Sequence, residues 1–117
     1  MSISLPLASL ISYFVYLISP TLINDNLEAQ VLEAISNDNY QFIETKLDNY
    51  IIDPNAKING KTLLIHACIY DKPEMVLLLL NKGASLNLPC DNGYTPEEHA
   101  RINNSIYALA QIIIVKA

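Results

Sequence analysis

The stretch that decides the fold is Gly-Lys-Thr-Leu-Leu-Ile-His-Ala, at residues 60–67. A related stretch begins 33 residues later, because Gly93 and Thr95 repeat the spacing of Gly60 and Thr62 (93 − 60 = 33). Further pairs at this offset are Ala34 and Ala67, Asp38 and Asp71, His66 and His99, and Ala67 and Ala100. A period of about 33 residues predicts a solenoid of stacked repeats.

Within one repeat the apolar residues follow a helical pattern. Met75, Val76 and Leu79 share one helix face. Pro73 suits the first turn of this helix, and Gly83 suits the position just after its end. Applied along the chain, the pattern predicts helices near residues 27–36, 40–49, 62–69, 73–81, 96–102 and 105–115.

The first helix of each repeat has a recognisable start. Thr62 and Thr95 each precede a short helical stretch, and a threonine hydroxyl there accepts a bond from a free backbone N–H. The two helices of each repeat should pack against each other as an antiparallel pair. The residues predicted to be nearly fully buried between them are Leu64, Ala67, Val76 and Leu79.

These stretches resemble the ankyrin repeat. Residues 60–67 are similar to that family's Gly-x-Thr-Pro-Leu-His-x-Ala opening, and residues 83–87, Gly-Ala-Ser-Leu-Asn, to its Gly-Ala-Asp-Val-Asn ending. The resemblance implies an all-α solenoid of helix-turn-helix units. It divides residues 25–117 into a degenerate first repeat (25–57), a central repeat (58–90) and a C-terminal capping repeat (91–117).

The sequence departs from the family pattern in two repeats. Leu63 and Ile65 stand where the family has Pro and His, so the bond from the family's His to the turn backbone is expected to be missing in the central repeat. Glu97 and Glu98 replace Leu and His in the last repeat. Carboxylates favour a first helical turn, and terminal repeats need polar outer faces, so both are interpreted as signs of a cap.

An apolar segment precedes the repeats. Residues 1–24 hold no charged side chain, and the first charge is Asp25. One interpretation is an extra N-terminal helix over residues 8–18 that packs on the open end of the stack, with Leu10, Phe14, Leu17 and Ile18 on one face. The other is a signal or membrane segment; Pro6, Pro20 and the missing basic flank weaken it. The first predicts an intracellular, cytoplasmic protein, and the second a secreted or membrane-anchored one.

Composition and motifs exclude several classes of function. A net charge of −5 without a Lys/Arg cluster disfavours nucleic acid, and three Gly leave no phosphate-binding loop. Cys68 follows His66 by two positions on a helix, so the two side chains diverge. His66 and His99 are only two ligands from separate repeats, which do not make a zinc site. We therefore expect no catalytic residues, no metal and no cofactor.

The surface is left as the functional feature. In ankyrin proteins the turn tips and the exposed side of each first helix usually bind another protein. That resemblance assigns partner binding to Ile58, Asn59, Lys61, Ile69, Tyr70, Asp91, Asn92, Tyr94, Ile102 and Asn103. Tyr70 and Tyr94 are expected to lie close together, and Asp91 with the net charge of −5 favours a basic patch on the partner. A membrane is a possible partner only through residues 1–24.

Overall fold

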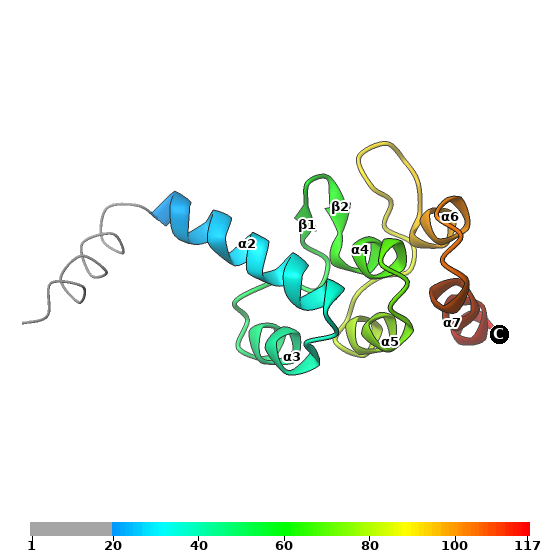
Figure 1. Ribbon diagram of the computed structural model, residues 1–117, viewed down its shortest axis with the longest axis horizontal. Helices are drawn as coiled ribbons and strands as arrows, with labels where there is room; N and C mark the ends of the chain where they lie inside the picture. The colour runs from blue at the N-terminus through cyan, green and yellow to red at the C-terminus, as the bar shows by residue number, and fades with distance from the viewer. Residues whose placement is uncertain (1–19) are drawn as a thin grey trace, which may run out of the picture. The chain divides into compact units, whose positions relative to one another are not determined.

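The computed structural model describes residues 20–117, with side chains from residue 26 onward. By its internal contacts the chain divides into two units, residues 1–30 and residues 31–117. The described elements, drawn in Figure 1, are α2 (Pro20–Ser36), α3 (Tyr40–Asp48), β1 (Lys57–Ile58), β2 (Lys61–Thr62), α4 (Leu63–Ile69), α5 (Pro73–Asn81), α6 (Pro96–Ile102) and α7 (Ile106–Lys116).

The second unit is a stack of helical pairs. Helix α4 packs against α5 and α6, α6 against α7, and α5 against both α3 and α7. The helices α3, α5 and α7 therefore form one layer, and α4 and α6 lie in the other, while the β1–β2 hairpin and the loop before α6 extend from the same side (Figure 1). This arrangement confirms the predicted all-α, ankyrin-type fold.

The backbone repeats with the period read from the sequence. Asp38, Asp71 and Asn104 lie 33 residues apart and have φ values of 57°, 58° and 55°. After each of them, the chain turns into the second helix of its repeat. The turn is closed each time by the same bond: the N–H of the next residue donates to the carbonyl of Ala34, Ala67 or Ala100 at 2.8–2.9 Å.

The helix ends that were predicted from a capping threonine, a proline or a glycine are confirmed. The hydroxyls of Thr62 and Thr95 accept bonds from the N–H groups of Ile65 and Glu98. Pro73 opens α5. Gly83 follows α5 with φ of 104°, a conformation in which a glycine has no Cβ to clash.

Side chains from both layers form the core, as predicted. Ala67, Val76 and Leu79 have no exposed surface, and Leu64 keeps 1%. Hydrogen bonds also tie consecutive repeats together: Asp71 Oδ1 accepts from the N–H of Ala108 at 2.8 Å, which fixes the start of α7. Each repeat therefore depends on its neighbour for both apolar burial and polar pairing.

Two features differ from the sequence-based predictions. Helix α2 begins at Pro20, not near residue 27; proline is well suited to a first helical position. The central repeat also opens with a short antiparallel hairpin, in which Lys57 pairs with Thr62 and Ile58 with Lys61. Each strand has only two residues, too few for the alternating pattern by which strands are found in a sequence.

The predicted helix at residues 8–18 lies outside the described residues. Among the described residues, no helix combines the length and the apolar character needed to cross a membrane.

Candidate protein-binding site

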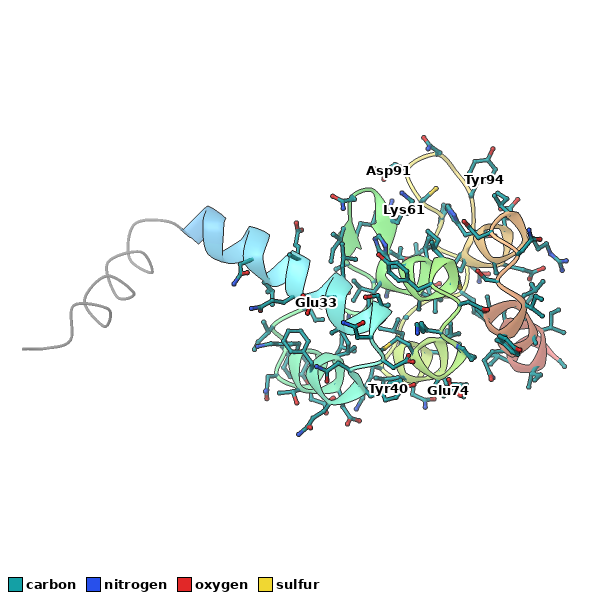
Figure 2. All side chains as sticks on the ribbon, viewed as in Figure 1. Glu33, Tyr40, Lys61, Glu74, Asp91 and Tyr94 are labelled. Carbon is teal, nitrogen blue, oxygen red and sulfur yellow. The ribbon has the colours of Figure 1, made fainter. Side chains whose placement is uncertain are left out.

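An open hollow of about 590 Å³ lies on the side of the second unit where the hairpin projects. The hairpin tip, the loop before α6 and the C-terminal ends of α4 and α6 surround it. It is lined by Asn59, Gly60, Lys61, Ile69, Cys90, Asp91, Asn92, Tyr94, His99, Ile102 and Asn103. Figure 2 shows Lys61, Asp91 and Tyr94 gathered on this side, while Tyr40 and Glu74 lie on the opposite side of the same unit.

Most of the residues selected from the sequence meet in this hollow. Those that line it are Asn59, Lys61, Ile69, Asp91, Asn92, Tyr94, Ile102 and Asn103. The assignment of Ile58 has to be corrected. Only 5% of Ile58 is exposed, because alternate residues of a strand face opposite sides and this side chain faces the core. The backbone of Ile58 has a structural role, because its carbonyl accepts a hydrogen bond from His66.

The second tyrosine lies outside the hollow. Tyr70 is 40% exposed and its ring stacks on His66, with 6.4 Å between centroids. Tyr94 is 47% exposed and its ring meets His99 edge-on at 6.1 Å. Each tyrosine thus packs on the histidine of its own repeat, and only Tyr94 contributes to the lining.

The rim of the hollow is held by contacts between repeats. Asn59 and Gly60 have φ values of 55° and 77°, the pair of positive angles that a type I′ two-residue hairpin turn requires. The Gly60 carbonyl accepts a 2.9 Å bond from the N–H of Asp91. The Asp91 carboxylate in turn lies 3.0 Å from Lys57 Nζ. A Cβ on residue 60 would meet Asp91 Oδ2 at 2.7 Å, so glycine allows this close approach.

His66 connects α4 to the hairpin. Its Nε2 lies 2.8 Å from the Ile58 carbonyl, which can only accept, so Nε2 carries the proton. Ile65 stands where the family has the histidine that bonds the turn backbone, and Ile65 is fully buried. His66, one position later, supplies a bond to the turn backbone instead. Burial lowers the pKa of His66, and nearby Lys61 and His99 lower it further, although the bond to Ile58 opposes the change. The lowered pKa favours the neutral form of the ring in the folded protein.

His99 is the corresponding histidine of the next repeat, and its environment differs. It is 9% exposed, and its Nε2 is buried with no hydrogen-bond partner among the described residues. Burial lowers the pKa of His99, and the charge of Lys61 acts in the same direction, against a smaller opposite effect of Glu98. The His99 ring thus lines the hollow, while its buried Nε2 has no hydrogen-bond partner among the described residues.

The two glutamates of the last repeat have separate roles. Glu98 Oε1 accepts bonds from the Thr95 N–H at 2.9 Å and the Thr95 hydroxyl at 3.0 Å, which completes a capping box at the start of α6. Glu97 pairs with Arg101 at 3.0 Å and Lys116 at 2.6 Å, and so links α6 to the end of α7. Both carboxylates are therefore engaged in holding the last repeat together.

The cysteines have different surroundings. Cys68 is fully buried, and burial raises the pKa of its thiol to about 12. Cys90 lines the hollow with 6% of its surface exposed. Among residues 26–117, no group of three or more His, Cys, Asp and Glu side chains is placed to hold a metal ion.

The sequence did not identify three lining residues. Gly60, Cys90 and His99 belong to the hollow but were not selected. For Gly60 a signal was available, because Asn-Gly is a strong hairpin-turn pair. For His99, nothing in the sequence context marks a nitrogen without a partner.

Comparison with known proteins gives two findings. The family described as Ankyrin repeats (3 copies) matches residues 31–116. A curated bovine protein, "Inactive serine/threonine-protein kinase TEX14" of Bos taurus, is 29% identical over 93 residues. The match covers 80% of this chain but only 6% of that protein.

Proposed function

Because the chain belongs to the ankyrin-repeat family, whose repeats are generally protein–protein interaction modules, we propose that it is a non-catalytic module that binds a partner protein in the hollow. One observation carries the proposal. Eight of the ten residues selected from the sequence as binding positions line a single hollow. They come from two repeats, so the site depends on stacking.

The chemistry of the lining supports a protein ligand. Tyr94 offers a ring with a polar end, and such residues are enriched among interface hot spots. Ile102 is 61% exposed and Ile69 is partly exposed beside it, which leaves apolar surface for a partner to cover. Asn59, Asn92 and Asn103 add amide groups that can pair with a peptide backbone.

Photo-crosslinking identifies the partner and tests the location of the site together. A photoreactive amino acid is placed at Tyr94, and in a second version at Tyr107, which is 68% exposed on α7 and serves as the matched control. We expect a protein adduct from Tyr94 and none from Tyr107. With the partner in hand, Tyr94→Ala should weaken binding by about 1–3 kcal/mol, and Tyr107→Ala should have no effect. Tyr70→Ala should weaken binding less than Tyr94→Ala, because its ring lies outside the hollow.

Two isoleucines provide a second matched pair. Ile102→Ala changes the lining of the hollow, and Ile106→Ala changes an isoleucine of similar exposure, 69%, outside it. Affinities that respond to Ile106→Ala and not to Ile102→Ala would place the interface on α7 and refute the proposal.

Residues 1–24 suggest a second form of the proposal, in which the module is secreted or membrane-tethered. The supporting observation is the uncharged, apolar sequence before Asp25. A reporter fused to residues 1–24 tests it: recovery in the membrane fraction or the medium supports targeting, and recovery in the cytosol refutes it.

A further inference from the structure

The hollow contains a positive charge that the described part of the chain leaves unpaired. Among the described residues, Lys61 is the basic side chain with neither a carboxylate within 4.0 Å nor an aromatic ring beneath it. The five that pair with carboxylates are Lys57, Lys72, Lys82, Arg101 and Lys116. Lys46 lies over the Phe42 ring, 5.2 Å from its centroid.

The single carboxylate in the lining does not neutralise Lys61. Asp91 is already engaged by Lys57 at 3.0 Å, and its backbone is fixed by the bond to Gly60. The lining therefore contributes one ammonium group, that of Lys61, and one carboxylate, that of Asp91, which is already paired with Lys57 outside the lining. The expectation that Asp91 attracts a basic group does not apply inside the hollow, although the chain's net charge of −5 still favours a partner with basic surroundings.

A second, independent observation points to a ligand at the same place. The Nε2 atom of His99 is buried and unpartnered among the described residues, in a ring that borders the hollow. The charge of Lys61 influences His99, so both groups act on the same region. A buried polar atom without a partner is unfavourable, and a ligand that bonds to it removes that cost.

The groups beside this pair are apolar. Ile69, Ile102 and the ring of Tyr94 line the same hollow. A ligand that fits all of them has an anionic oxygen next to a hydrocarbon surface. Carboxylate oxygens are acceptors only, so they can accept bonds from the Lys61 ammonium and from the Nε2–H of a neutral His99 in the tautomer that carries its proton on Nε2.

We propose that the partner inserts an acidic side chain, Asp or Glu, between Lys61 and His99, and places a neighbouring apolar side chain against Ile69 and Ile102. This inference rests on the proposed function, because it names the chemistry of the partner that the hollow receives. The acidic residue gives specificity, since a lysine in its place would face Lys61 and leave His99 without a bond to a carboxylate.

A peptide library tests the inference with a defined probe. The protein selects from short peptides blocked at both ends, with a fixed leucine followed by Glu, Asp, Gln or Lys, and random residues elsewhere. Blocked ends ensure that any recognised carboxylate belongs to a side chain. We expect enrichment of Glu or Asp over Gln and Lys at the fixed position. A library without any binder, or with no acidic preference, would overturn the inference.

Variants then locate the acidic residue. Lys61→Met should weaken the selected peptide about tenfold or more, whereas Lys46→Met, which removes the same charge from α3, should change its affinity less than about twofold. Lys61→Glu should switch the preference from the Glu peptide to its Lys counterpart. Thermal melts of each variant show that the fold is retained.

The imidazole of His99 gives a direct spectroscopic readout. In the ¹⁵N NMR spectrum, the Nε2 resonance of His99 should shift when the Glu peptide is added and stay in place with the Gln peptide. If Tyr94→Ala weakens the peptide while Lys61→Met and the His99 resonance show no effect, the inference fails and the binding function stands. If neither Tyr94→Ala nor Lys61→Met affects binding, the site is elsewhere and both proposals fail.

Discussion

Replacing Leu79 by alanine perturbs the helix at the centre of the stack. Leu79 is fully buried in α5, which packs against α3, α4 and α7. The change removes about three buried carbons at ~0.8 kcal/mol each, or about 2.4 kcal/mol. A residual cavity of up to about 80 Å³ adds as much as about 2 kcal/mol. The expected loss in the free energy of unfolding is therefore about 3–4 kcal/mol.

That loss is large relative to the whole domain. A domain of this size has a total stability on the order of 5–15 kcal/mol. Each kcal/mol corresponds to a fall of about 4–8 °C in Tm, so Leu79→Ala should lower Tm by about 12–30 °C. Because each repeat is stabilised by its neighbours, the variant should unfold in one cooperative transition and not lose a single repeat.

A neighbouring leucine on the same helix provides the control. Leu77 is 37% exposed, so Leu77→Ala should lower the free energy of unfolding by less than about 1 kcal/mol. Circular dichroism during heating and during urea titration measures both variants. Equal destabilisation by the two changes, or a Tm for Leu79→Ala within about 5 °C of wild type, would refute the alignment of the repeats and the burial that follows from it.

Two further changes test the caps and the histidines. Thr95→Ala breaks the capping box of α6 and should lower the free energy of unfolding by about 1 kcal/mol, whereas Thr45→Ala, an exposed site inside α3, should be neutral or slightly stabilising in the same urea titration. Because the pKa of His66 in the folded protein is lowered below its ordinary value of 6.5, its contribution to stability is present above pH 6.5 and is lost as the pH falls through the lowered pKa. The wild type should therefore lose more stability between about pH 7 and about pH 5.5 than His66→Gln does, and equal losses by the two proteins would contradict this origin.

Local sequence signals determined the elements of the fold. Thr62, Pro73 and Gly83 each act through their own backbone or the residues immediately following, by capping, fixing φ or allowing a positive φ. The 33-residue period adds the order of the repeats, because a unit that cannot bury its apolar face alone must stack on the next one. These effects act over a few residues or repeat regularly, so they can be read without coordinates.

Tertiary structure decided the properties of the site. Lys57 and Asp91 are 34 residues apart, and only stacking brings their charges together and leaves Lys61 unpaired among the described residues. Ile58 faces the core because of a two-residue strand that no sequence period reveals. His66 and His99 occupy equivalent positions, yet one donates to a hairpin carbonyl and the other has an unpartnered nitrogen. The sequence cannot distinguish the two histidines, because the hydrogen bonding and burial of each side chain depend on which neighbouring repeat it meets.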